Sequence, residues 1–209
     1  MNYPKNLLQS VVFLDRDGVI NRDSPDYIKN WDEFEFLPGS LEAIRHLTLN
    51  GFVSIIITNQ SAVNRRIMSK QDLETIHEKM KNAVKSCGGE IRDVFFCPHM
   101  PEDQCNCRKP KPGLILRAQK VYRIDLRSAC MIGDSAKDIE CARKAGCALA
   151  VLVQTGDWVK AENILKEKNL CPDYVATDLY EASKWIVGLR SLKRPNFVPD
   201  ERTMPYRIK

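Results

Sequence analysis

The segment that decides the fold of this 209-residue chain is VVFLDRDGVIN, residues 11–21. It begins with four apolar residues, and such a run bounded by polar residues predicts a strand buried on both faces of a parallel sheet. Asp15 and Asp17 follow two positions apart, so their side chains are expected to point the same way. Because Gly18 must break the strand, the pair is predicted at the carboxyl edge of the sheet, where open α/β sheets bind ligands.

Outward from this segment, strand-like and helix-like patterns alternate along the chain. Strands are predicted at residues 11–15, 53–58, 93–97, 129–133, 148–154 and 174–176. Helices are predicted at residues 40–50, 70–87, 114–122, 136–145, 160–169 and 179–189, with Ser69 as an N-cap. This alternation predicts an α/β fold, a three-layer doubly wound parallel sheet with right-handed crossovers. Residues 1–190 are interpreted as one domain, and residues 191–209, which contain three prolines, as an extended tail.

Composition places the chain among ordinary globular proteins. It is 44% hydrophobic and 28% charged, with a formal net charge of +5 at pH 7. That mild positive charge suits phosphorylated substrates and nucleic acids alike. No stretch approaches the ~20 apolar residues of a membrane span, and residues 1–10 lack the pattern of a secretory signal. We therefore expect a cytoplasmic protein with no membrane partner, and take a monomer as the default.

The eight cysteines are accordingly expected to be thiols or metal ligands rather than disulfides. Five stand singly in or beside apolar stretches and are expected to pack in the core: Cys87, Cys130, Cys141, Cys147 and Cys171. The other three form the pattern C-x-H-x5-C-x-C with one histidine: Cys97, His99, Cys105 and Cys107. Three thiolates and an imidazole suit a closed tetrahedral Zn²⁺ site, which leaves no position open for catalysis. We therefore predict a structural zinc that orients the residues directly after Cys107.

Polar segments follow four predicted strands in an order that suits phosphoryl transfer. DRDGVIN supplies two carboxylates, TNQS supplies hydroxyl and loop N–H groups, RKPKPG supplies cations, and GDSAKD supplies Asp134 with Asp138 one helical turn later. Such a reaction needs a nucleophile, a metal, donors for the phosphate oxygens and a countercharge. Asp134 can complete an oxygen-ligand set for Mg²⁺, and Asp138 can support that set from behind.

Together, DRDGVIN, TNQS, RKPKPG and GDSAKD resemble the four motifs of the haloacid-dehalogenase (HAD) phosphohydrolase superfamily, over roughly residues 11–155. Within it, the Cys/His pattern and the wording DRDGVIN…TNQS…CRKP are similar to the D-glycero-D-manno-heptose 1,7-bisphosphate 7-phosphatase family. Histidinol-phosphate phosphatases are its nearest relatives. The resemblance implies a phosphoric monoester hydrolase that acts on a small phosphorylated sugar, in the synthesis of nucleotide-activated heptose and lipopolysaccharide precursors.

The resemblance also implies roles for individual residues. Asp15 would attack phosphorus and carry an aspartyl-phosphate, and Asp17 would protonate the leaving alkoxide and then deprotonate water. Mg²⁺ would bridge Asp15, the backbone carbonyl of Asp17 and Asp134. Thr58 and Lys109 would stabilise the charge on the equatorial phosphate oxygens.

Candidate substrate contacts are Asp23, Tyr27, Asn59 and Arg108, the last because a guanidinium can grip a second phosphate. The segment 22–27 is one residue longer than the family usually has, and residues 62–66 replace its usual glycine-containing stretch. The gaps between the motifs are too short for a cap domain, so we expect an open site walled by the loops at 22–37, 61–68 and 97–108.

Three other functions remain open from the sequence. Histidinol-phosphate phosphatase belongs to the same reaction class, and a 3′-end polynucleotide phosphatase would carry similar catalytic motifs. A zinc-stabilised nucleic-acid-binding module with a basic tail is the alternative from another class. Against it, basic and aromatic residues do not gather in one stripe, and we expect no nucleic-acid partner.

Overall fold

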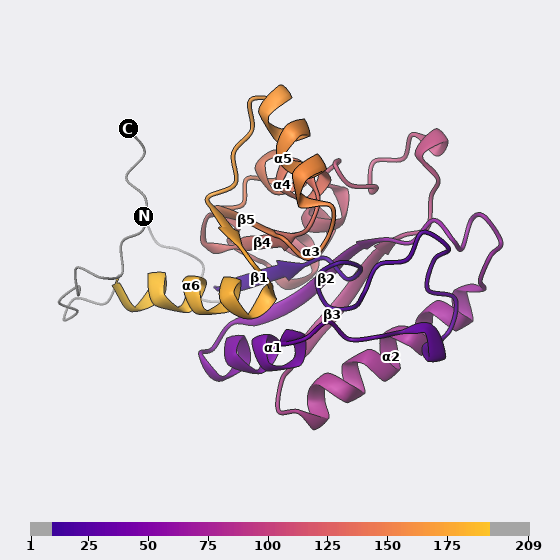
Figure 1. Cartoon of the computed structure of the whole chain (residues 1–209), viewed down its shortest axis with the longest axis horizontal. Helices are drawn as coiled ribbons and strands as arrows, with labels where there is room; N and C mark the ends of the chain where they lie inside the picture. Colours follow the sequence, from indigo (N-terminus) through magenta and orange to yellow (C-terminus); the bar gives the residue numbers. More distant parts are fainter. Residues whose placement is uncertain (1–9, 193–209) are drawn as a thin grey trace.

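The buried run at residues 11–14 is the centre of a six-stranded parallel sheet with the strand order β3-β2-β1-β4-β5-β6 (Figure 1). The computed structural model describes residues 10–192. Its strands are β1 (Val11–Leu14), β2 (Val53–Asn59), β3 (Ile91–Cys97), β4 (Cys130–Gly133), β5 (Leu149–Val153) and β6 (Tyr174–Ala176). β1 pairs with β2 on one side and with β4 on the other. The chain thus grows outward to β3 and then returns to the far side of β1, which creates a topological switch point between β1 and β4.

Helices cover both faces of the sheet (Figure 1). One layer contains α1 (Ser40–Leu49), α2 (Lys70–Ser86) and α6 (Leu179–Leu192), and the other contains α3 (Gly113–Tyr122), α4 (Ala136–Ala145) and α5 (Trp158–Glu167). A hydrophobic core lies on each face of the sheet, and β1 contributes to both because successive side chains of a strand point to opposite faces. Val12 and Leu14 pack against the first helix layer, and Val11 and Phe13 pack against the second. All four residues are 0–1% exposed, so the predicted strand buried on both faces, and with it the three-layer α/β fold, is confirmed.

Capping residues in the sequence mark the ends of several helices. Ser69 caps α2 through a reciprocal pair of hydrogen bonds with Asp72. Gly146 ends α4 in the left-handed conformation, with φ of 83°. α6 continues to Leu192, three residues beyond the predicted end of this helix at residue 189. The rest of the predicted tail, residues 193–209, lies outside the described residues.

The cysteine predictions are correct for three of the five single residues. Cys130, Cys141 and Cys147 are buried, whereas Cys87 and Cys171 are exposed. Cys87 is the C-cap of α2, and Cys171 lies in the loop before β6. Both therefore lie at element ends, where the backbone reaches the surface, and their immediate neighbours include polar residues, glycine or proline.

The connections that reach the switch point are short. The described chain between β1 and β2 forms a loop, a 3₁₀ turn at Trp31–Glu33 and α1, and the connection from β2 to β3 holds α2. Neither contains a separate domain, in agreement with the prediction that no cap covers this edge of the sheet. No helix in residues 10–192 has the length and apolar content that crossing a membrane requires.

Candidate active site

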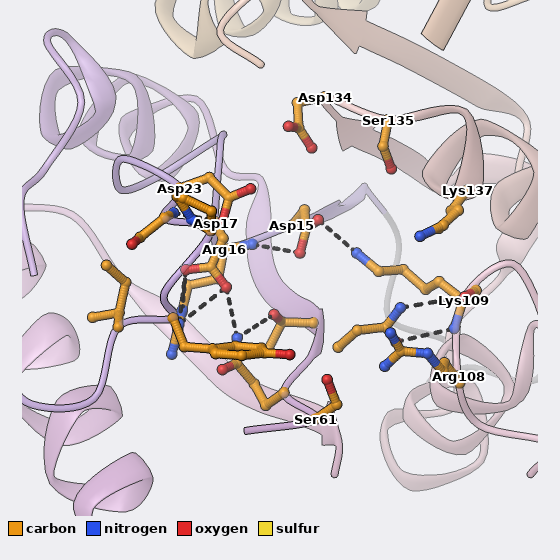
Figure 2. Close-up of a pocket in the computed structure, with 17 residues that line it drawn as sticks. Asp15, Arg16, Asp17, Asp23, Ser61, Arg108, Lys109, Asp134, Ser135 and Lys137 are labelled. Atoms are coloured by element: carbon orange, nitrogen blue, oxygen red, sulfur yellow. Dashed lines mark hydrogen bonds and ion pairs between the residues drawn. The ribbon is translucent and has the colours of Figure 1, made fainter. Parts of the chain in front are cut away.

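The carboxyl ends of β1, β2 and β4, together with the segment after β3, line one pocket at the switch point (Figure 2). All residues predicted for catalysis or substrate contact line it: Asp15, Asp17, Asp23, Tyr27, Thr58, Asn59, Arg108, Lys109 and Asp134. Of the three loops expected to wall the site, the one at 22–37 contributes several residues, whereas the loop at 61–68 contributes only Ser61 and the loop at 97–108 only Arg108. Arg65 and Arg66 are exposed outside the pocket lining. The geometry thus brings the predicted residues together; their chemical roles stay predictions.

Lys109 reaches Asp15 from the opposite side of the pocket (Figure 2). Its side chain is 2% exposed, and its Nζ lies 2.8 Å from Asp15 Oδ2 and 2.6 Å from Asp138 Oδ1. Burial by itself would lower the pKa of Lys109, but the Asp138 and Asp15 carboxylates raise it above its ordinary value. The lysine is therefore a fixed positive charge directly beside Asp15.

Asp15, Asp134 and Asp138 form what we call the acidic centre, because one carboxylate oxygen of each lies within 4.8 Å of the others. Burial, together with the neighbouring carboxylates and against the pull of Lys109, raises the pKa of Asp15 to about 7. Burial, with Asp138 and Asp15 adding to it, raises the pKa of Asp134 to about 8. One ammonium thus fails to balance three carboxylates, and a divalent cation would supply the missing charge. An all-oxygen donor set of this kind fits Mg²⁺.

Two glycines let the backbone approach Asp134. Gly18 has a φ of 76°, and a Cβ at Gly18 or at Gly156 would collide with the Asp134 carboxylate. The turn after β1 is also tied to the segment after β5, because the Thr155 hydroxyl donates to the Gly18 carbonyl. The position of Asp134 therefore depends on two glycine turns that only the folded chain brings together.

Asp138 is buried behind the pocket, at the position where the sequence predicted a residue that supports the Mg²⁺ ligands. Its Oδ2 accepts hydrogen bonds from the Ser135 amide at 3.1 Å and from the Ser135 hydroxyl at 2.6 Å, which caps α4. Its Oδ1 holds Lys109, so one fully buried carboxylate fixes both the start of α4 and the lysine ammonium of the pocket.

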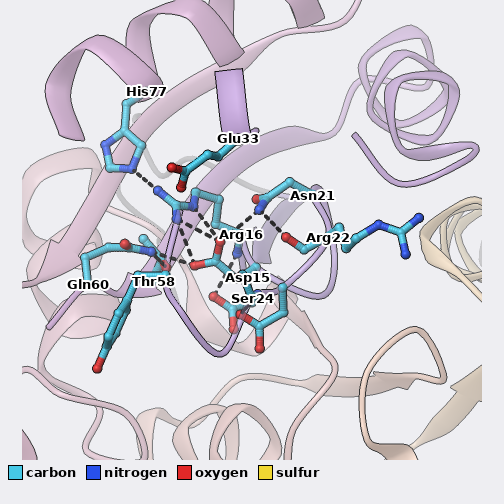
Figure 3. A network of polar contacts seen from close by, with 12 residues as sticks. Asp15, Arg16, Asn21, Arg22, Ser24, Glu33, Thr58, Gln60 and His77 are labelled. Carbon is cyan, nitrogen blue, oxygen red and sulfur yellow. Dashed lines mark hydrogen bonds and ion pairs between the residues drawn. The ribbon is translucent and has the colours of Figure 1, made fainter. Parts of the chain in front are cut away.

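Asp17 lies in a different environment from the acidic centre (Figure 3). Its Oδ1 accepts from Arg16 Nη2 at 2.7 Å and from Asn21 Nδ2 at 2.9 Å, and its Oδ2 accepts from Gln60 Nε2 at 2.7 Å. Burial alone would raise the pKa of Asp17, but the Arg16 charge and these hydrogen bonds hold it below the ordinary value. Sequence reasoning did not assign Arg16 or Gln60. Their only signal was their position inside DRDGVIN and TNQS, beside predicted site residues.

Thr58 and Asn59 are both fixed by neighbours. The Thr58 hydroxyl accepts from Gln60 Nε2 at 2.9 Å, which leaves its own proton free to donate to a phosphate oxygen. The Asn59 amide donates to the Lys109 carbonyl at 3.2 Å and accepts from the Lys109 amide at 3.1 Å. Asn59 therefore holds the backbone of Lys109; it also lines the pocket, and its predicted contact with substrate stays a prediction.

Residues at the pocket mouth remain available to a ligand. Asp23 and Tyr27 lie on the loop that follows β1, and Arg108 enters from the opposite side (Figure 2). Arg108 donates one guanidinium nitrogen to the His99 carbonyl at 3.1 Å, which fixes the side chain to the loop after β3. Lys111 donates to the Gln104 carbonyl at 2.8 Å and thus also braces this loop.

The Cys/His cluster, defined as Cys97, His99, Cys105 and Cys107, gathers one ligand atom from each residue within 4.8 Å. The S···S distances are 3.3–3.6 Å, and His99 Nδ1 lies 3.2 Å from Cys107 Sγ. These are close to the edges of a tetrahedron around a metal with bonds of about 2.0–2.3 Å. The residues present therefore fit a four-ligand metal site directly before Arg108 and Lys109.

Comparison with known proteins agrees with this geometry. The HAD-hydrolase-like family matches residues 106–182. A D-glycero-beta-D-manno-heptose-1,7-bisphosphate 7-phosphatase from Bordetella bronchiseptica is 42% identical over 169 residues, which cover 79% of this chain and 94% of the relative. The enzyme of the same name from Pseudomonas aeruginosa is 43% identical, over 73% of this chain and 85% of the relative. The crystal structure of the B. bronchiseptica D,D-heptose 1,7-bisphosphate phosphatase with magnesium and phosphate superposes with a TM-score of 0.80, at 38% identity, over 86% of this chain and 99% of that one.

Proposed function

This chain belongs to the D-glycero-D-manno-heptose-1,7-bisphosphate 7-phosphatase family of HAD-like hydrolases, and from that premise we propose that it removes the 7-phosphate of a heptose 1,7-bisphosphate with Mg²⁺ as cofactor. The observation that carries the proposal is the placement of the buried Lys109 ammonium against Asp15, inside a pocket that also contains Asp17, Thr58 and Asp134. A binding module has no need for a buried carboxylate held against a buried ammonium. A phosphatase that works through an aspartyl-phosphate uses such a carboxylate as its nucleophile.

In the proposed reaction, Asp15 attacks the 7-phosphorus, the bond from phosphorus to the sugar oxygen breaks, and an aspartyl-phosphate forms. Lys109 and the Thr58 hydroxyl hold the phosphate oxygens as their charge changes. Mg²⁺, which Asp15 and Asp134 together with the Asp17 carbonyl would hold, supplies the positive charge that lets an anionic nucleophile meet an anionic phosphate. Arg108 is left to orient the remainder of the substrate at the pocket mouth.

Asp17 moves the proton in both halves of the reaction. It donates to the leaving sugar alkoxide, and it then takes a proton from the water that hydrolyses the aspartyl-phosphate. The donors around its carboxylate favour the ionised form that the second half requires. In the first half, the negative charge of a bound phosphate opposes those donors and favours the protonated form.

We propose Zn²⁺ for the Cys/His cluster, because three sulfurs and one nitrogen in a tetrahedral arrangement are typical of structural zinc. Such a metal would fix the loop on which Arg108 and Lys109 lie. Thiolate ligands also suit a reducing compartment, which supports a cytoplasmic location. The product would then serve the synthesis of nucleotide-activated heptose for lipopolysaccharide precursors.

Release of inorganic phosphate from a substrate panel tests the proposal. The panel contains both anomers of D-glycero-D-manno-heptose 1,7-bisphosphate, histidinol phosphate and a 3′-phosphorylated oligonucleotide, each with and without Mg²⁺. We expect Mg²⁺-dependent turnover that is fastest on one heptose bisphosphate anomer. Preference for histidinol phosphate or for the oligonucleotide would replace the proposed substrate, and absence of any phosphate release would remove the enzyme assignment.

A further inference from the structure

Arg16 is the largest fully buried side chain in the described chain, although it carries a permanent charge. Its side chain is 1% exposed, and Nε and Nη2 both donate to Asp17, at 3.1 Å and 2.7 Å. Burying a guanidinium is costly unless its donors find partners. Asp17 satisfies one edge of the group, so the other edge needs a second acceptor.

That acceptor comes from α2, far away in the sequence. His77 Nε2 lies 3.4 Å from Arg16 Nη1 (Figure 3), and the His77 side chain belongs to the buried face of α2 with Ile76 and Met80. Its ring also lies against Phe96 of β3, with 5.9 Å between the ring centroids. The imidazole is thus held from two elements and cannot simply turn away from Arg16.

Charge decides which group donates in this contact. The guanidinium has no acceptor, so its N–H donates and Nε2 accepts. Burial and the Arg16 charge lower the pKa of His77 to about 3, which keeps the ring neutral at physiological pH. The guanidinium donor beside Nε2 then selects the tautomer whose proton is on Nδ1. His77, Arg16 and Asp17 therefore form one line of hydrogen bonds from α2 to the pocket.

We propose that His77 is a positioning residue for proton transfer, which acts through Arg16 to hold the Asp17 carboxylate towards the leaving-group oxygen. The inference rests on the proposed phosphatase function. His77 accepts a hydrogen bond from Nη1 of Arg16 and so fixes the orientation of the guanidinium plane. The Nε and Nη2 atoms of that plane donate to Asp17. Without it, the Arg16 side chain has no partner at Nη1 and can rotate, and the angle of the Asp17 carboxylate changes with it. Asn21 and Gln60 would still bind Asp17 but leave its orientation less defined.

The leaving group separates this role from a purely structural one. A sugar alkoxide needs a proton as it departs, whereas p-nitrophenolate departs readily without one. Loss of orientation at Asp17 should therefore reduce kcat/KM on an alkyl phosphate and spare kcat/KM on p-nitrophenyl phosphate. General loosening of the pocket would reduce both values equally.

The test uses two substitutions of nearly equal size, His77→Met and His77→Gln, because only glutamine restores a strong acceptor towards Arg16. We expect His77→Met to lose roughly 10- to 100-fold in kcat/KM on the heptose bisphosphate and less than about 3-fold on p-nitrophenyl phosphate, within the range that a general acid contributes. His77→Gln should keep both values within about 3-fold of the wild type. In an Arg16→Met background, His77→Met should cause no further loss, since the two residues act in series.

His46→Met is the matched control. His46 is also a partly buried histidine with a side-chain partner, the Ser183 hydroxyl at 3.2 Å, but it lies between α1 and α6, away from the pocket. It should leave the ratio of the two kcat/KM values unchanged. If His77→Met does not fold, His77→Asn replaces it, because the shorter amide cannot reach Arg16.

Three results would overturn the inference: equal losses on both substrates, a His77→Gln variant as impaired as His77→Met, or additive losses in the Arg16→Met background. Failure of the proposed function looks different, because the wild type would then not hydrolyse the heptose bisphosphate. In that case, the same comparison is made with any alkyl phosphate that the wild type does hydrolyse.

Discussion

The acidic centre and the Cys/His cluster lie at the same edge of the sheet and are built in opposite ways. The acidic centre combines three carboxylates from the ends of β1 and β4 and the start of α4. The buried Lys109 forms ion pairs with two of them and partly neutralises their charge. The Cys/His cluster takes sulfur and nitrogen ligands from one short segment, and three of its four residues are partly exposed. Oxygen ligands around a pocket leave room for a substrate, whereas four soft ligands close the coordination sphere. This difference supports the two proposed roles, reaction at the acidic centre and orientation of a loop by the Cys/His cluster.

The strongest test of this comparison is to remove the proposed nucleophile, Asp15, from the acidic centre. Asp15→Asn should abolish turnover, by roughly 10⁴-fold or more, because a carboxamide cannot form the phospho-enzyme. Steady-state phosphate release measures the effect, and Asp32→Asn on the exposed 3₁₀ turn is the control with unchanged rate. Appreciable turnover by Asp15→Asn would contradict covalent catalysis.

Lys109 tests whether the acidic centre needs its internal cation for rate or only for binding. Lys109→Ala should lower kcat by about 10²–10³-fold and raise KM much less, since the ammonium stabilises charge that develops during transfer. The Mg²⁺-free variant should also lose about 3–5 kcal/mol of unfolding free energy, because Asp15 and Asp138 are left buried without their partner.

Steady-state kinetics and urea unfolding measure the two effects, with the exposed Lys120→Ala as control. A larger effect on KM than on kcat would make Lys109 a binding residue.

Removal of the proposed zinc tests the role of the Cys/His cluster. A Cys105→Ser protein, or a chelated wild type that stays folded, should have a disordered loop at residues 97–108 and kcat/KM reduced by roughly 10-fold. Its Mg²⁺ affinity should be unchanged, because no ligand of the acidic centre lies in this loop.

Hydrogen exchange of the loop and Mg²⁺ titration of activity check this outcome, with the exposed Cys87→Ser as the control. Full turnover in a zinc-free, folded sample would contradict an orienting role for the Cys/His cluster.

The smallest expected effect is a pH dependence of the unfolding free energy that comes from Asp134 in the acidic centre. The pKa of Asp134 is raised to about 8 from an ordinary value of 3.8, so the folded protein binds more protons than the unfolded chain between these values. Without Mg²⁺, the Asp134 contribution must therefore destabilise the fold increasingly as pH rises towards 8. Asp134→Asn should gain about 2 kcal/mol relative to wild type between pH 6.5 and pH 8.5.

Urea unfolding of both proteins in Mg²⁺-free buffer measures this gain, and the cysteine contributions cancel because both proteins share them. Mg²⁺ should abolish the difference. A gain that is independent of pH would mean that the acidic centre carries no uncompensated charge.

How much the sequence predicts depends on the distance in the chain between the interacting groups. The Cys/His cluster was predictable because eleven residues contain all four ligands, and their spacing alone suits one metal. The apolar run of β1 likewise predicted its own burial, and therefore placed Asp15 at the sheet edge. The alternate use of Asn59, which holds the Lys109 backbone, was not predictable, because it joins β2 to the segment after β3.

By itself, then, the sequence determined the order of the elements, the four polar strand ends and the ligand set of the loop, since each follows from spacing along a short stretch of chain. Only the tertiary structure decided which of these groups meet: that Lys109 lies between Asp15 and Asp138, and that a histidine on α2 lies behind the arginine next to Asp17. The physical reason is that strand register and helix packing set such contacts. They arise from the burial of apolar side chains over the whole molecule and leave no local pattern in the residues that they bring together.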